Sequence, residues 1–164
     1  MILTLAEAKR MMAENNGNLD LTNAHIKELP EGLTYIDGNL DLTDSDIERL
    51  PDGLTVTGWV DLGGSHISVL PDNMYVGDSL FVVRGMSMKN LPRVKQLPKN
   101  LHVEKNLIIL DTDICRTPPD LYVGGGLYLA RGISSWKHAH FMKSKKESPN
   151  NILEFLDTPI KWLR

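Results

Sequence analysis

"GNLDLTNAHIKELPEGL" occupies residues 17–33, and "GNLDLTDSDIERLPDGL" occupies residues 38–54. The two stretches are nearly identical and begin 21 residues apart. A third copy, "GWVDLGGSHISVLPDNMYV", covers residues 58–76 in the same register. Self-similarity at a short, fixed period indicates one supersecondary unit that is stacked several times. The sequence therefore predicts a solenoid.

The repeat continues toward the C-terminus with changes. Residues 77–103 form a fourth, longer copy, residues 105–123 form a fifth, and residues 124–133 begin a sixth. The consensus is G-x-L-x-L-x-x-(S/T)-x-I-x-x-L-P-x-x-L-x-V. Its L-x-L element alternates as a half-buried strand does, and Pro and Gly then force turns before a second extended piece that ends in Val. One such unit is too short to enclose a core, so we expect successive units to bury their apolar side chains against one another.

The combination of L-x-L with L-P-x-x-L resembles the leucine-rich repeat family over residues 17–133. It is most similar to the short bacterial repeats of secreted effectors and to repeats of bacteriophage-encoded proteins. The resemblance implies an α/β-type repeat solenoid, a right-handed coil with a parallel sheet on its concave side. The family usually places Asn in the turn after the strand, where the side chain bonds to neighbouring backbone. This sequence departs from that pattern, with Ala24, Ser45, Ser65, Gly85, Thr112 and Gly132 at those positions. Hydroxyl groups can supply part of that bonding.

The apolar consensus positions predict the core. They are Leu19, Leu21, Ile26, Leu29, Leu40, Leu42, Ile47, Leu50, Val60, Leu62, Ile67, Leu70, Leu80, Val82, Leu107, Ile109, Ile114, Leu127 and Leu129. A stack of this kind has two open ends that other segments must cover. We expect an N-terminal capping helix over residues 1–16, begun by a capping box of Thr4 and Glu7. Residues 134–164 are expected to form a helical C-terminal cap, with a helix from Ser148-Pro149 through residues 150–156.

Composition places the chain among ordinary soluble proteins. It has 164 residues, 41% hydrophobic and 24% charged, with a net charge of −3. Cys115 is the only cysteine, so no intrachain disulfide can form. The first residues do not resemble a signal peptide, and no run approaches the roughly 18 apolar residues of a membrane span. These features predict a cytoplasmic, single-domain protein that does not enter a membrane.

The residue between the two leucines of each strand points outward, and equivalent residues lie side by side on neighbouring strands. This column reads Asp20, Asp41, Asp61, Phe81, Ile108 and Tyr128, and the adjacent positions add Trp59, Val83 and Leu110. The acidic half predicts an anionic groove for a basic partner or a cation site, or else reflects recent duplication alone. The apolar half predicts a protein-contact site, because contiguous apolar surface usually marks one, unless the C-terminal residues fold back over it.

The fourth repeat contains an insertion that is rich in basic residues. They are Arg84, Lys89, Arg93, Lys95 and Lys99. Insertions in solenoids form loops on one face, often the binding face. The insertion is therefore either a solvated loop or a contact for an acidic protein surface or for nucleic-acid phosphate. No known nucleic-acid-binding motif accompanies it.

The residues carry no arrangement that requires catalysis, a metal or a cofactor. His25, His66 and His102 occupy scattered positions of the solenoid, and none has the spacing of a metal-binding motif. The sequence therefore predicts a non-catalytic protein that binds another protein through the concave face and the fourth-repeat insertion. In a phage or bacterial setting such a protein would bind and modulate a host protein. Two alternatives remain open: nucleic-acid binding or DNA mimicry by the aspartate column, and a homodimer formed through the apolar half.

Overall fold

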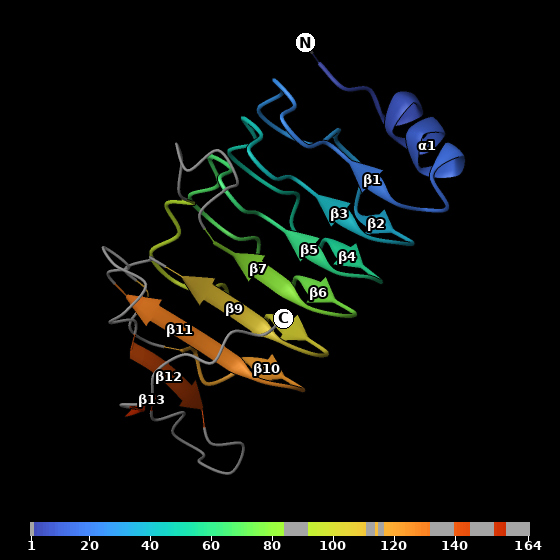
Figure 1. Cartoon of the computed structure of the whole chain (residues 1–164). Coiled ribbons are helices and arrows are strands. Elements are labelled where there is room, and N and C mark those ends of the chain that lie inside the picture. Colours follow the sequence, from blue (N-terminus) through green and yellow to red (C-terminus); the bar gives the residue numbers. More distant parts are fainter. Residues whose placement is uncertain are drawn as a thin grey trace.

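The computed structural model describes residues 2–83, 92–110, 114, 117–131, 140–144 and 153–156. The repeats form a solenoid of parallel strands, in which each turn contributes one strand to a long sheet and one to a short sheet (Figure 1). The coarse prediction of a repeat solenoid is therefore confirmed.

The long sheet has the strand order β1-β3-β5-β7-β9-β11-β12-β13, and the short sheet has the order β10-β8-β6-β4-β2. The long sheet comprises β1 (Leu19–Asp20), β3 (Leu40–Asp41), β5 (Val60–Asp61), β7 (Leu80–Val82), β9 (Leu107–Leu110), β11 (Leu127–Arg131), β12 (His140–Ser144) and β13 (Leu153–Leu156). The short sheet comprises β2 (Tyr35–Ile36), β4 (Thr55–Val56), β6 (Tyr75–Val76), β8 (His102–Val103) and β10 (Tyr122–Val123).

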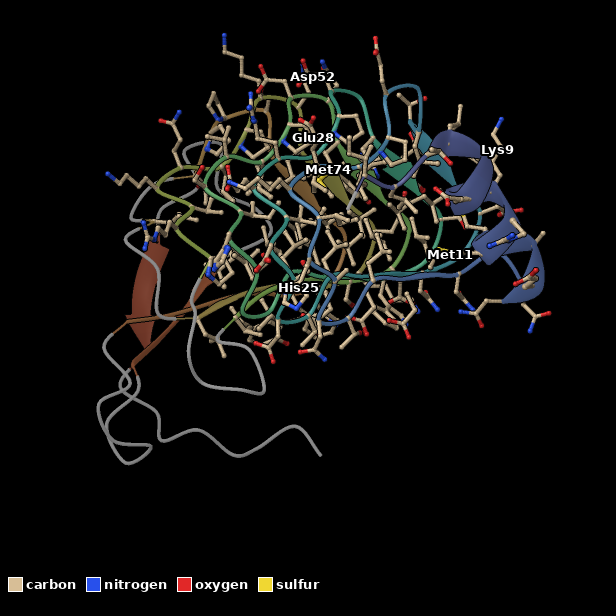
Figure 2. The ribbon with its side chains drawn as sticks, turned by 90° about the horizontal axis from the view of Figure 1, so that it is seen from above. Lys9, Met11, His25, Glu28, Asp52 and Met74 are labelled. Carbon is tan, nitrogen blue, oxygen red and sulfur yellow. The ribbon has the colours of Figure 1, made fainter. Side chains whose placement is uncertain are left out.

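The core lies inside the coil, between the two sheets and the turns that join them. Every residue predicted for the core is buried except Leu129, whose side chain is not among those the structure describes. The short strands and the residues just before them add buried residues that the prediction omitted: Ile36, Leu54, Val56, Met74, Val76, Leu101 and Val103. Met74, for example, is fully buried and lies inside the coil in Figure 2.

The L-P turns before β2, β4, β6 and β8 share one backbone conformation, which explains a residue choice in each of them. Gly32, Gly53, Asn73 and Asn100 occupy equivalent places in successive turns, with φ values of 83°, 67°, 58° and 54°. Glycine and asparagine are the residues that adopt this left-handed region most readily. The asparagines also bond to each other, because Asn100 Nδ2 donates to Asn73 Oδ1 at 2.9 Å.

Asparagine bonding occurs before the long-sheet strand, where the sequence analysis did not expect it. Asn18 Oδ1 accepts from the backbone N–H of Asn39, Asn39 Oδ1 from that of Trp59, and Asn106 Oδ1 from that of Gly126, each at 2.9 Å. Each amide side chain thus joins its own turn to the next, which fixes the register of the stacked strands.

Hydroxyl groups serve the turn after the strand, as expected. The side chains of Ser45 and Ser65 are buried and donate to the carbonyl oxygens of Leu42 and Leu62, each at 2.7 Å. Each of these carbonyl oxygens also accepts from the backbone N–H of the same serine at 3.1 Å, so the hydroxyl group adds a second hydrogen bond within the buried turn. The equivalent positions Gly85, Thr112 and Gly132 lie outside the described residues.

The helix expected at the N-terminus is present as α1 (Leu5–Glu14). Its capping box forms as predicted, because Thr4 Oγ1 accepts from Glu7 N at 3.2 Å and Glu7 Oε2 accepts from Thr4 N at 2.9 Å. Ala8 is fully buried against the solenoid, and Lys9 lies on the outer side (Figure 2). Figure 1 shows α1 beside β1 and β2, at the N-terminal end of the stack.

The C-terminal prediction of a helix over residues 150–156 was wrong. Leu153–Leu156 forms strand β13, which pairs antiparallel with β12, and β12 pairs antiparallel with β11. The edge of β11 offers unpaired backbone groups that a strand can use, whereas a helix this short is marginal by itself. Residues 134–139, 145–152 and 157–164 of the expected cap lie outside the described residues. Among the described residues, no helix has the length and apolar character needed to cross a membrane.

Candidate functional site

The predicted outward column forms as expected on the long sheet. Strand pairing places Asp20 beside Asp41, Asp41 beside Asp61, Asp61 beside Phe81, Phe81 beside Ile108, and Ile108 beside Tyr128. We call the outward side of strands β1, β3, β5, β7, β9 and β11 the strand face. Its character changes from acidic to apolar between β5 and β7.

The three aspartates of the strand face are held in the same way. In each case Oδ1 accepts from the backbone N–H two residues later: Asp20 from Thr22 at 3.0 Å, Asp41 from Thr43 at 2.9 Å, and Asp61 from Gly63 at 2.8 Å. Identical bonding gives the carboxylates similar orientations on strands that lie about 4.8 Å apart. Like charges at such spacing repel by about 1 kcal/mol in water and by more where water is excluded.

Asp61 is the most strongly affected of the three. Burial, together with the negative charges of Asp41 and Asp44, raises the pKa of its carboxyl group, although the bond from Gly63 N–H opposes the shift. Asp20, in contrast, is exposed on the edge strand β1. Folding therefore places a carboxylate at position 61 where the charged form is disfavoured.

Asp61→Asn should raise the free energy of unfolding at pH 7 by about 1 kcal/mol, because it removes the repulsion from Asp41 while the amide oxygen keeps the bond to Gly63. The sign follows from linkage: a raised folded-state pKa means that the charged carboxyl destabilises the fold above its unfolded-state pKa. The gain should therefore shrink as the pH falls toward 3. Urea unfolding of both proteins across pH 3–7 measures it.

Asp20→Asn is the matched control, because the same substitution at an exposed site should change stability little. A loss of stability on Asp61→Asn at pH 7 would contradict the assignment of Asp61 as a disfavoured charge.

The apolar half of the strand face joins side chains from three neighbouring strands. Phe81, Val83, Ile108, Leu110 and Tyr128 are each half-buried, as is Trp59 at the border with the acidic half. A side chain at Gly126 would collide with the ring of Tyr128, so the glycine leaves room for the ring along its own strand. Strands β12 and β13 pair beyond β11 and extend the sheet sideways. The rest of residues 134–164, which could cover the apolar half, falls outside the described residues.

The structure does not bring the described basic residues of the insertion onto the strand face. Arg84 and Lys89 lie outside the described residues. Arg93, Lys95 and Lys99 are exposed in the connection between β7 and β8. Arg93 N donates to Ile67 O, and Lys99 N donates to Asp72 Oδ1. The connection that carries these three residues therefore stacks on the outer turns of the preceding repeat.

Two of the histidines are not scattered, contrary to the sequence analysis. His25, Asp46 and His66 lie in one column, with His25 Nδ1 2.9 Å from one carboxyl oxygen of Asp46 and His66 Nδ1 3.7 Å from the other. The hydrogen bond from His25, with the nearby charges of both histidines, lowers the pKa of Asp46. Among the described residues, no group of three His, Cys, Asp or Glu side chains could hold a metal ion. The column is thus a polar contact between turns, and the repeat alignment would have revealed it.

The outward column of the short sheet is aromatic, and the sequence analysis missed it. It reads Tyr35, Thr55, Tyr75, His102 and Tyr122, which are paired in that order. The ring centroids of Tyr75 and His102 lie 5.0 Å apart, and those of His102 and Tyr122 lie 4.2 Å apart, both in stacked orientation. Glu104 bonds to this stack through His102 Nε2 at 2.8 Å and the Tyr75 hydroxyl at 3.3 Å. The sequence signal was the residue before the last Val or Ile of each repeat.

Comparison with known proteins identified no relative of this chain. The chain has no significant match among protein-family models, curated proteins or solved structures.

Proposed function

We propose that the protein is a non-catalytic module that binds another protein through the strand face. The observation that carries the proposal is the register of the long sheet, which sets apolar side chains of β7, β9 and β11 beside three bonded aspartates. In finer detail, we propose a leucine-rich repeat coil of right-handed sense, with the strand face on its concave side. The repeat consensus and the parallel pairing of the repeat strands, β1 to β11, in both sheets support that assignment.

The two halves of the strand face would contribute differently to binding. Phe81, Ile108 and Tyr128 offer large apolar surface whose burial favours association, and aromatic residues are frequent anchors of such interfaces. Asp41 and Asp61 repel each other in the free protein, and a basic side chain from the partner would relieve that repulsion. The expected partner surface therefore has an apolar centre with a basic region beside it.

The cellular setting belongs to the same proposal. The resemblance of the repeats to bacterial and phage-encoded proteins supports a bacterial cytoplasm, where the module would bind and modulate a host protein.

The double variant Phe81→Ala/Tyr128→Ala should lose the partner and keep the fold. Affinity purification from bacterial lysate, with wild type and variant side by side, measures the loss. Val69→Ala is the matched control, because Val69 is 62% exposed and lies between β5 and β6, away from the strand face. The control should retain the partner that wild type retains.

Three outcomes would contradict the proposal, and each points elsewhere. Unfolding of the double variant would assign both rings to the core. A homodimer that the double variant splits, with no partner lost, would make the apolar half an assembly surface. Competition between this protein and DNA for a basic protein, abolished by Asp41→Asn/Asp61→Asn, would instead indicate DNA mimicry.

A further inference from the structure

The aromatic column on the short sheet contains one gap. Four of its five positions carry a ring, and the exception is Thr55 on β4, between Tyr35 on β2 and Tyr75 on β6. Tyr75 stacks on His102 with one ring face, so its other face is directed toward the strand that carries Thr55. Tyr35 is 57% exposed, so its ring is accessible to a ligand.

His102 shows what fits between two tyrosines of this column. Its flat ring lies on the strand between Tyr75 and Tyr122, at 5.0 Å and 4.2 Å from their centroids. Thr55 occupies the same relation to Tyr35 and Tyr75, because strands two places apart are separated by about 10 Å. The space above Thr55 therefore has the width of one flat group stacked on both sides.

The charged residues near Thr55 indicate which kind of flat group would bind between the two tyrosines. Asp37 follows β2 on the same side as Tyr35 and accepts from the Thr57 hydroxyl at 3.2 Å. On the other side of the short strands, the L-P turns place the exposed acids Glu31, Asp52 and Asp72. The gap thus has Asp37 at one end of its strands and the acidic turns at the other, and these charges favour a cation and disfavour a phosphate-bearing nucleobase. A guanidinium group is planar and permanently charged, and it binds carboxylates through a pair of hydrogen bonds.

We propose that the space above Thr55 is a second binding site, which accepts an arginine side chain of a basic polypeptide between Tyr35 and Tyr75. The guanidinium group would stack on the Tyr75 face that His102 leaves free, and Tyr35 would close over its opposite face. Asp37 would accept its N–H groups at the edge. This site is separate from the strand face and does not depend on the function proposed for that face.

Fluorescence anisotropy with short labelled peptides tests the site. Three peptides are compared, in which serine alternates with arginine, with lysine and with citrulline, respectively. Citrulline has the planar shape of arginine but carries no charge. The arginine peptide should bind at least fivefold more tightly than the lysine peptide, because stacking between rings requires a planar cation. The citrulline peptide should bind more weakly still, because it lacks attraction to the acids.

Thr55→Tyr fills the gap and should weaken binding of the arginine peptide about tenfold, while a tyrosine in a strand leaves the fold intact. Val69→Tyr adds the same ring elsewhere on the surface and should leave binding unchanged. Tyr35→Ala provides a second variant, since its exposed ring can be removed without disturbing the core, and it should also weaken binding.

Equal binding of the arginine and lysine peptides, unaffected by Thr55→Tyr, would overturn the proposal and leave only general attraction to acidic surface. Binding that survives Thr55→Tyr but disappears in Asp20→Asn/Asp41→Asn/Asp61→Asn would place the peptide on the strand face instead. Phe81→Ala/Tyr128→Ala should leave the peptide bound, which separates failure of this site from failure of the strand-face function.

Discussion

Leu42→Ala is expected to lower the free energy of unfolding by about 2–5 kcal/mol, the range for large-to-small changes in a packed core. Leu42 is fully buried and stands in one column with Leu21 and Leu62 of the neighbouring turns. Stability in a solenoid is the sum of contacts between adjacent turns, so a cavity at position 42 weakens the contacts on both sides. Urea unfolding followed by circular dichroism measures the loss.

Val69→Ala is the control for Leu42→Ala, because it removes apolar atoms from a side chain that is 62% exposed. Its effect should stay within about 0.5 kcal/mol. A loss below 1 kcal/mol for Leu42→Ala would show that the central turns are loosely packed, which would contradict the stacked core.

The repeat period was sufficient to predict the strand face. Once Leu19, Leu40 and Val60 are aligned, the residues that follow them must become neighbours, and strand pairing confirms this. The period applied equally to the other sides of the coil. The column of His25, Asp46 and His66 and the aromatic column on the short sheet were missed because outward-facing residues were compared across the repeats only in the L-x-L element.

Differences in exposure and pKa among equivalent residues could not be predicted from the repeat pattern. Asp20, Asp41 and Asp61 stand in the same sequence context, L-D-L or V-D-L. Asp20 is exposed because β1 is an edge strand, whereas Asp61 is half-buried because it has Asp41 on one side and Phe81 on the other. The raised pKa of Asp61 therefore depends on its position in the stack, which no single repeat encodes.

The helix prediction for the C-terminal segment was wrong for a different reason. The repeat ends near residue 133, and beyond it the sequence has no period that distinguishes a strand from a helix. The edge of β11 decided the structure of β12 and β13, since its unpaired backbone groups accept another strand. That edge exists only after the solenoid has formed, so local propensity could not indicate it.

Gly17→Ala is expected to lower the free energy of unfolding by about 3 kcal/mol, from two separate causes. Gly17 has a φ of 87°, a conformation that costs a residue with a side chain about 1–2 kcal/mol. In addition, a methyl group there would fall on the carbonyl oxygen of Asp37, so the junction between α1 and the first turn must shift. Overpacking of that kind costs about 1–3 kcal/mol. Thermal and urea unfolding measure the total.

Gly53→Ala separates the two causes. Gly53 has a similar φ of 67°, but a methyl group there would meet no atom within 4 Å. Its substitution should therefore cost only the conformational part, about 1 kcal/mol. A clearly larger loss for Gly17→Ala would show that close approach of successive turns requires glycine at position 17. Equal losses for the two variants would show that the left-handed conformation alone explains both glycines and that the turns can separate at little cost.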